Sequence, residues 1–180
     1  VWRVGDWVEG VRLLSGRKFR RTVVGVEKRG YVVQQRDLQT RLSEGRRFYT
    51  LEFNPVAKMD ARGEVEWSAK PAVPYFRWPL KLNGTWSGSY RWGGGKRTYR
   101  VKVRVDAYER VHTPAGTFKA LRLELFPAER AVEPGRKGVL RYWYAPELGQ
   151  VVRMEFEQQP EDSWALTAYQ RAPRPPAKGK

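Results

Sequence analysis

Three glycines at positions 93–95 stand directly before Lys96 and Arg97, in the segment GTWSGSYRWGGGKRTYR. A glycine-rich turn followed by lysine can bind phosphate, because its backbone N–H groups and the lysine face the anion. A Walker-type loop also needs glycine five residues before the glycine that precedes lysine, and Ser or Thr after the lysine. Those positions hold Tyr90 and Arg97. The residues that follow alternate as a strand does, whereas a phosphate loop leads into a helix. We therefore interpret the glycines as a hairpin turn.

His112 is the only histidine, and the chain has no cysteine. A Ser-His-Asp triad or an imidazole metal site would have to use His112. That residue stands beside the turn sequence TPAG, and no nucleophile-elbow motif accompanies it. The lack of cysteine excludes disulfides, thiolate nucleophiles and thiolate metal ligands. We expect His112 to be a polar residue next to a turn, and we predict no catalytic residue, no metal site and no cofactor.

Carboxylates offer the one remaining route to catalysis. Glu155 and Glu157 share a strand face, and Asp60, Glu64 and Glu66 cluster further upstream. Two carboxylates beside aromatic residues can hydrolyse glycosides when they lie at the right separation. In a chain with 35 basic and 19 acidic residues, acids on strands more commonly pair with cross-strand Arg and Lys. We predict that the protein is not an enzyme.

The basic residues are the better functional candidates. The net charge is +16, and it divides evenly between the two halves of the chain. One basic group follows the turn at Ser15 and Gly16, and a second follows the glycine turn. The two groups together are Arg17, Lys18, Arg20, Arg21, Lys96, Arg97, Arg100, Lys102 and Arg104. If one sheet presented both groups as a single positive surface, that surface could bind an anionic partner. The alternative is a charged, solvated sheet face that keeps edges from pairing.

Period-2 alternation dominates the elements that would carry these residues. In 99–108, apolar and charged residues alternate; 118–125 does the same, and turn residues between the two segments predict one long hairpin. Further strands are expected at 6–14, 17–26, 30–36, 46–53, 84–92, 137–144, 150–157 and 163–170. A short helix is predicted near 36–45. The fold class is therefore all-β, with a curved antiparallel sheet or half-barrel of about ten strands and at most one short helix.

Two segments differ from this pattern. Residues 54–82 contain four prolines, and we expect a long connection there rather than a central strand. The Pro-rich, basic residues 171–180 are typical of a disordered tail. Residues 1–170 are accordingly predicted to form a single antiparallel β domain.

The chain also contains an approximate internal repeat. Residues 5–18 (GDWVEGVRLLSGRK) align without gaps on 84–97 (GTWSGSYRWGGGKR), so that Trp7 matches Trp86 and Arg12 matches Arg91. Both segments continue into valine-rich strands. We interpret them as two related hairpin units. Because the first copy makes its turn with only Ser15 and Gly16, three glycines are not needed for a shared role.

Three stretches resemble a known family: YFRWPLKLNGTWSGSY (75–90), VHTPAGTFKALRLEL (111–125) and RYWYAPELGQVVRMEFE (141–157). They are similar to an uncharacterised family of bacterial cell-envelope (periplasmic) proteins, many of them exported, with W-P-L, P-A-G-T-F and W-Y-[AS]-P motifs. The resemblance implies an antiparallel sheet curled like the half-barrels of lipoprotein carriers. It supplies no catalytic residues. It covers 75–157 and hardly extends to the N-terminal part.

No apolar run is long enough to span a bilayer as a helix. The chain begins with Val1, so we expect a mature periplasmic or envelope form whose export signal has been removed, with a cytoplasmic protein as the alternative.

We predict a non-enzymatic cell-envelope protein, either a scaffold or a binder of an apolar or anionic envelope ligand such as lipid or polysaccharide, or a partner of another envelope protein. Aromatic residues would form the core or the apolar part of the site: Trp78, Trp86, Tyr142, Trp143 and Tyr144. The alternative is a module that binds single-stranded nucleic acid through a basic, aromatic sheet face.

Overall fold

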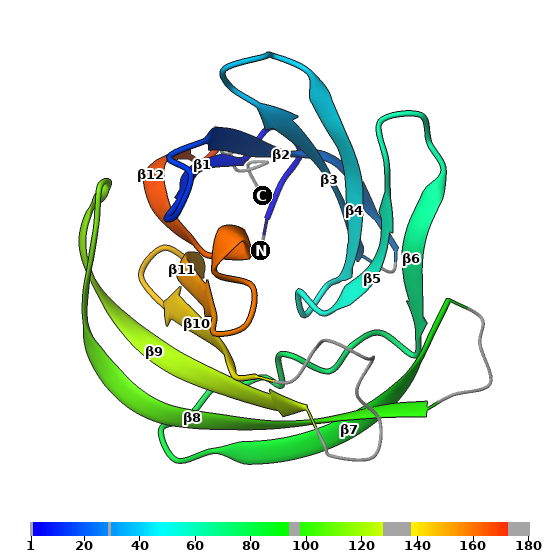
Figure 1. Cartoon of the computed structure of the whole chain (residues 1–180). Helices are drawn as coiled ribbons and strands as arrows, with labels where there is room; N and C mark the ends of the chain where they lie inside the picture. The colour runs from blue at the N-terminus through cyan, green and yellow to red at the C-terminus, as the bar shows by residue number, and fades with distance from the viewer. Residues whose placement is uncertain (1, 29, 94–97, 128–137, 173–180) are drawn as a thin grey trace, which may run out of the picture.

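A computed structural model describes residues 2–28, 30–93, 98–127 and 138–172. Within these residues the chain forms twelve antiparallel strands, each paired with its neighbours in sequence (Figure 1). The strands are β1 (Trp7–Arg12), β2 (Lys18–Glu27), β3 (Gly30–Asp37), β4 (Ser43–Thr50), β5 (Pro55–Met59), β6 (Val65–Lys70), β7 (Thr85–Trp92), β8 (Thr98–Thr113), β9 (Gly116–Pro127), β10 (Leu140–Ala145), β11 (Gln150–Phe156) and β12 (Trp164–Gln170). β1 also pairs with β12, from Trp7 opposite Gln170 to Arg12 opposite Trp164, and this pairing closes the sheet into a barrel.

The prediction of an all-β, antiparallel fold is confirmed, and each of the ten predicted segments contains a strand. The sheet is a closed barrel, a step further than the half-barrel considered from the sequence. The two additional strands, β5 and β6, lie within 54–82, so the prediction of a long connection there was wrong over much of its length. Pro55 is the first residue of β5, and Pro71 follows the last residue of β6. A proline is tolerated at the start of a strand, where its missing N–H breaks no ladder.

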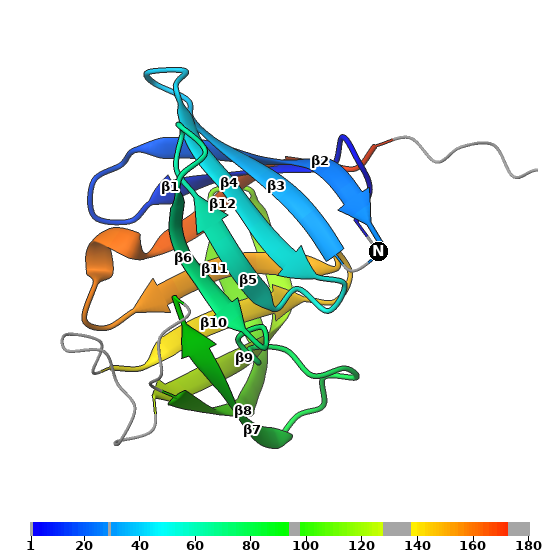
Figure 2. The ribbon, with the colours of Figure 1, turned by 90° about the vertical axis from the view of Figure 1, so that its right-hand side faces the viewer.

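The remaining connection, residues 71–84, crosses one end of the barrel (Figure 2). It is anchored by Asn54, whose side chain donates to the carbonyl of Phe76 at 3.0 Å and accepts from the Phe76 N–H at 2.7 Å. Its residues Val73 and Phe76 are buried. The connection therefore packs inward and contributes side chains to the barrel interior.

The helix predicted near 36–45 is absent. The Asp37 carboxylate accepts the backbone N–H groups of Gln39 and Thr40, both at 2.8 Å, and so holds a tight turn between β3 and β4. An acidic side chain that bonds the backbone two residues on favours a turn over a helix. Among the described residues, the one helical element is a 3₁₀ turn at Pro160–Asp162.

The two related hairpins predicted from the repeat are β1–β2 and β7–β8, and their strands pair antiparallel. β7 and β8, on either side of the glycine segment, pair as the strands of a hairpin, whereas Gly94 and Gly95 lie outside the described residues. Gly16 and Gly93 both adopt positive φ, at 69° and 59°, which glycine tolerates. Lys96 and Arg97 lie outside the described residues. The long β8–β9 hairpin is also confirmed, with Gly116 at its turn.

Two apolar clusters support the barrel wall. Val103 and Val105 of β8 are fully buried against Leu123 and Leu125 of β9, as their alternation predicts. The end of the same hairpin forms the second cluster, in which Val111, Phe118 and Ala120 pack with residues of β10–β12: Trp143, Ala145, Val152 and Leu166. Ala115 N–H, at the hairpin turn, donates to the Leu166 carbonyl at 3.1 Å. The hairpin end is thus fastened to β12.

Arg171 and Ala172, the first residues of the predicted tail, are bound to the barrel. Asp6, which is 3 % exposed, accepts hydrogen bonds from the Ala172 N–H at 2.6 Å and from the Arg171 guanidinium at 3.1 Å. Residues 173–180 lie outside the described part of the chain.

Candidate ligand-binding cavity

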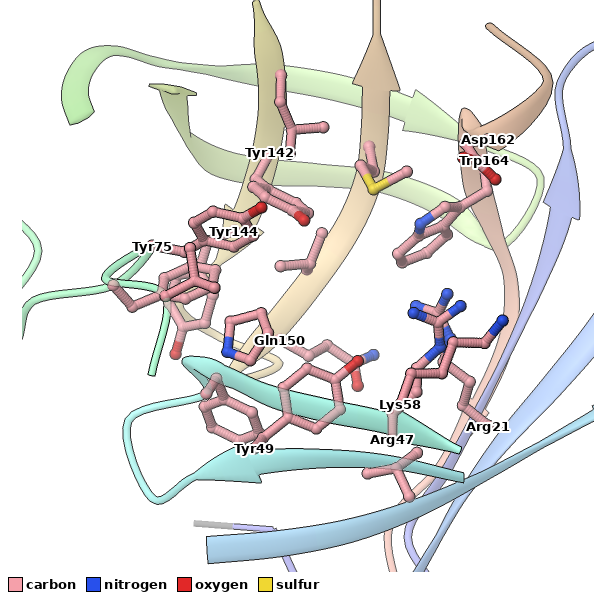
Figure 3. A pocket seen from close by; sticks show the side chains of 18 of the residues that line it. Arg21, Arg47, Tyr49, Lys58, Tyr75, Tyr142, Tyr144, Gln150, Asp162 and Trp164 are labelled. Carbon is pink, nitrogen blue, oxygen red and sulfur yellow. The ribbon is translucent and has the colours of Figure 1, made fainter. Parts of the chain in front are cut away.

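The barrel encloses a cavity of about 380 Å³. A barrel of this many strands is too wide for its own inward side chains to fill. The volume falls in the lower part of the range of small-molecule sites. Side chains from β1–β7, β10–β12 and the 71–84 connection line it (Figure 3). Its walls differ in charge and polarity.

One wall is cationic. Arg12, Arg21, Arg47 and Lys58 line the cavity from β1, β2, β4 and β5. Arg47 and Lys58 are direct cross-strand neighbours, so their side chains leave the sheet on the same face. Figure 3 shows Arg21, Arg47 and Lys58 gathered at one side of the cavity. We refer to these four residues as the cationic wall.

Two of the four cations have carboxylate partners. Arg12 lies 3.3 Å from Asp162, and Lys58 lies 2.5 Å from Glu66. Arg21 and Arg47 form no salt bridge with any carboxylate of the described residues. Instead the Nε atoms of both donate to one acceptor, the Gln35 side-chain oxygen, at 2.8 and 3.2 Å. The two guanidinium groups are therefore fixed by a neutral amide, and their charges are not neutralised by it.

The pKa of Arg21 reflects the lack of a carboxylate partner. Desolvation, followed by repulsion from Arg47, lowers the Arg21 pKa to about 10. The Arg21 guanidinium lies over the rings of Phe19 and Trp164, at 4.7 and 5.2 Å from their centroids. Desolvation also lowers the pKa of Arg12, although Asp162 acts in the opposite direction. At neutral pH both arginines remain charged, and Arg21 is held where the charge is unfavourable without a counter-ion.

The opposite wall is aromatic. Tyr75, Phe76, Trp78, Tyr142 and Tyr144 meet here, with Tyr142 centred 5.8 Å from Tyr75 and 5.9 Å from Phe76, and Trp78 centred 5.0 Å from Tyr144. We refer to these five residues as the aromatic wall. Burial raises the pKa of Tyr142 well above its ordinary value, so its hydroxyl stays neutral. In Figure 3, Tyr75, Tyr142 and Tyr144 lie across the cavity from Arg21 and Lys58.

Two buried donors in the lining have no hydrogen-bond partner among the described residues. They are the indole N–H of Trp164 and the side-chain amide nitrogen of Gln150. Trp164 is 3 % exposed and Gln150 is 5 % exposed, and both line the cavity. A buried donor without an acceptor costs free energy, and such groups occur at sites where a ligand or water supplies the acceptor.

The structure does not gather the predicted basic residues. On β2, Arg21 faces the cavity and Arg20 pairs with Glu9, and Arg17, just before β2, pairs with Asp37. Of β8, Arg104 pairs with Glu124, whereas Arg100 and Lys102 are exposed. Lys18 is exposed on β2. Five strands separate β2 from β8 in either direction around the barrel, so the described members of the two basic groups lie on opposite sides of it (Figure 1).

The predicted aromatic residues separate into two sets. Trp78, Tyr142 and Tyr144 belong to the aromatic wall. Trp86 donates to the Pro74 carbonyl at 3.0 Å and packs against the β8–β9 cluster. Trp143 is buried in the second cluster and donates to Glu109 at 2.7 Å. These last two therefore support the wall and do not line the cavity.

The other residues considered for chemistry have structural partners. His112 Nδ1 lies 2.8 Å from the Thr117 hydroxyl beside the hairpin turn. Glu157 pairs with Arg141 of β10, a cross-strand partner as expected, whereas Glu155 pairs with Arg153 of its own strand, β11. Over the described residues, no group of three or more His, Cys, Asp or Glu side chains could hold a metal ion.

Sequence reasoning missed several cavity residues, among them Arg12, Arg47, Lys58, Tyr75, Phe76, Gln150 and Trp164. Arg47 alternates with Gly45 and Tyr49, and this period-2 spacing was the one available signal that it shares a face with Tyr49. Lys58 and Gln150 lie in or beside segments interpreted as connection and turn. Nothing in the sequence indicated that they face the same space.

No protein family model matches the chain, and no curated protein matches it. Among solved structures, the chain is similar to a predicted exported protein with a YmcC-like fold from Bacteroides fragilis, with a TM-score of 0.55, 16 % identity, and coverage of 94 % of this chain and 97 % of that one. It also matches a predicted lipoprotein from Parabacteroides distasonis, with a TM-score of 0.47, 15 % identity, and coverage of 93 % and 96 %. At such identity, the first likeness establishes the fold alone. No described helix is both long and apolar enough to cross a membrane.

Proposed function

We propose that this protein is a non-enzymatic cell-envelope protein that binds an amphipathic anion inside its barrel. The anionic group contacts Arg21 and Arg47 on the cationic wall, and the apolar part lies against the aromatic wall. The observation that carries this proposal is the pair of guanidinium groups that face the cavity without a carboxylate partner among the described residues. A buried charge of this kind is unfavourable until a counter-ion binds.

The aromatic wall supports the second half of the proposal. Tyrosine and tryptophan rings offer large apolar faces, and their polar groups can still hydrogen-bond at the edge. A ligand with an alkyl chain would bury that chain against Phe76 and Tyr142, at roughly 25 cal/mol for each Å² of apolar area removed from water. The unpartnered N–H groups of Trp164 and Gln150 would donate to acceptor atoms of the ligand.

An envelope location is supported by two observations. The structural neighbour from Bacteroides fragilis is itself a predicted exported protein. The W-P-L, P-A-G-T-F and W-Y-[AS]-P motifs resemble those of a cell-envelope family. Amphipathic anions such as anionic lipids are abundant in that compartment, and a barrel that encloses them would shield their chains from water.

The nucleic-acid alternative gains no support from the geometry. It required the basic residues of β2 and β8 to share one surface, but these strands lie on opposite sides of the barrel. Nucleic acid also could not enter a cavity of about 380 Å³ as a strand.

Tryptophan fluorescence tests the proposal, because Trp164 and Trp78 line the cavity. Decanoate or decyl phosphate, added below its micelle concentration, is expected to shift the emission saturably with one site per chain. Decanol, which lacks the charge, is expected to bind more weakly by at least tenfold. If neither anion binds, or if decanol binds as tightly as both, the proposed function is wrong. Native mass spectrometry of the protein as purified would show any retained ligand.

A further inference from the structure

The number of charges in the cavity narrows the chemistry of the ligand. Its lining contains four cationic side chains, the cationic wall, and two carboxylates, Glu66 and Asp162. Each carboxylate already pairs with one cation, Lys58 and Arg12 respectively. Two positive charges are left, those of Arg21 and Arg47. Tyr142 and Tyr144 do not alter this count, because burial raises the pKa values of both.

Acids outside the lining are committed elsewhere. Asp37 pairs with Arg17 at 2.5 Å, and Glu44 lies 3.9 Å from the same arginine. Glu44 also accepts a hydrogen bond from the Gln35 amide nitrogen, so it helps to orient Gln35. Glu44 and Asp37 do not line the cavity. Glu44 therefore holds Gln35 from outside the cavity, and neither acid forms a salt bridge with Arg21 or Arg47.

The hydrogen bonds of Arg21 and Arg47 also favour a ligand group with two negative charges. Gln35 accepts from the Nε atom of Arg21 and from the Nε atom of Arg47. The Nη groups of both arginines form no hydrogen bond with the described residues, and each guanidinium presents several N–H donors in a rigid plane. A carboxylate has two oxygens and one charge, which suits one guanidinium. A phosphate monoester has three terminal oxygens and close to two charges, which suits two guanidiniums.

We infer that the anionic group recognised by this cavity is a dianion, the phosphate monoester of an alkyl chain. This inference rests on the proposed function, because it specifies the charged end of the same ligand. Arg21 and Arg47 would each donate from their Nη groups to different phosphate oxygens, with Gln35 holding the two planes in place. The chain would lie on the aromatic wall.

The test compares ligands that share a chain and differ in charge. Decyl phosphate, decyl sulfate and decanoate are titrated against the full chain by calorimetry at pH 8 and at pH 5. The sulfate has the tetrahedral shape of the phosphate but only one charge. At pH 8 we expect decyl phosphate to bind about tenfold or more tightly than decyl sulfate, since one further charge contact in a buried site is of that order. At pH 5 the phosphate carries one proton, because its second pKa is near 6, and the difference should nearly disappear.

Two variants locate the effect. Arg21→Gln and Arg47→Gln should each abolish the preference for phosphate over sulfate at pH 8. Arg110→Gln, on an exposed position of β8, should leave it unchanged. Arg47→Lys, a further variant that keeps the charge, should retain part of the preference. Circular dichroism of each variant confirms that it folds.

The outcomes separate the two proposals. Equal affinities for phosphate and sulfate at pH 8 would overturn the dianion and leave an amphipathic anion as the ligand. Absence of binding by all three ligands would overturn the proposed function and the inference together. If inorganic phosphate alone bound as tightly as decyl phosphate, the cavity would recognise a dianion without a chain, which contradicts the role of the aromatic wall.

Discussion

Replacing Arg21 by methionine should make the ligand-free protein more stable, although it removes a cavity contact. The drop of the Arg21 pKa to about 10 corresponds to about 3 kcal/mol against the charged form. This value is an upper bound, because the side chain is half-buried and retains contact with the cavity. Methionine loses the hydrogen bond to Gln35, which costs about 1 kcal/mol, while Arg47 continues to satisfy the same oxygen. We expect a net gain of about 1–2 kcal/mol at pH 7.

The pH dependence provides an internal check with a defined sign. The pKa of Arg21 is lower in the folded than in the unfolded state, so the folded protein loses this proton first as the pH rises. Below pH 10 the charged form predominates in both states, and the cost is constant. Above pH 10 the cost is relieved, and the wild-type protein should approach the stability of Arg21→Met.

Urea unfolding followed by circular dichroism measures both effects. For a chain of this length the gain corresponds to a rise in Tm of about 2–8 °C. The matched control Arg110→Met replaces an exposed arginine of β8 and should change the free energy of unfolding by less than about 0.5 kcal/mol. A loss of stability greater than about 1 kcal/mol in Arg21→Met, with the control unchanged, would refute the idea that Arg21 is held at an electrostatic cost.

Three further perturbations test the framework of the barrel. Leu123→Ala, at a fully buried position between β8 and β10, should lower the free energy of unfolding by about 2–5 kcal/mol in urea titrations, and an effect below 1 kcal/mol would contradict the packing. Gly10→Ala would place a methyl group 2.6 Å from the Phe19 ring, so the free energy of unfolding should fall by about 1–3 kcal/mol. An unchanged Tm in thermal unfolding would contradict this contact. Asp37 has its pKa lowered to about 2, first by the backbone N–H of Thr40 and then by Arg17. Its contribution to stability is present above about pH 4 and lost as the pH falls towards 2. Asp37→Asn should therefore weaken the dependence of the free energy of unfolding on pH between about 4 and 2. Curves of unfolding free energy against pH that run parallel for the two proteins would contradict this role of Asp37.

The strands were predictable because their cause is local. Val101, Val103 and Val105 alternate with charged residues, and this pattern places one face of β8 in the core whatever its neighbours are. Barrel closure was not predictable in the same way, because it depends on β1 meeting β12 at the other end of the chain. The proline at the start of β5 and the turn at Asp37 misled in opposite directions. The proline suggested a connection without strands, and the segment after Asp37 suggested a helix.

The cavity residues were harder to predict from the sequence than the strands were. Arg21 was interpreted as part of an outer basic surface, yet Phe19 and Val23 flank it two positions away on the same face of β2 and are buried. Alternation alone therefore assigns Arg21 to the inside, and its charge obscured that signal. Lys58 and Trp164 come from strands far apart in the sequence and meet only because the sheet closes. Their juxtaposition depends on register and curvature, which no local pattern encodes.

The most direct measurement is a crystal structure of the protein with ω-bromodecyl phosphate bound, because anomalous scattering locates the bromine at the end of the chain independently of the phosphate. We expect the phosphate oxygens within hydrogen-bond distance of the Nη groups of Arg21 and Arg47, and the bromine against Phe76 and Tyr142 on the aromatic wall. A ligand bound on the outer surface of the barrel, or one whose bromine lies on the cationic wall, would contradict the proposed binding mode.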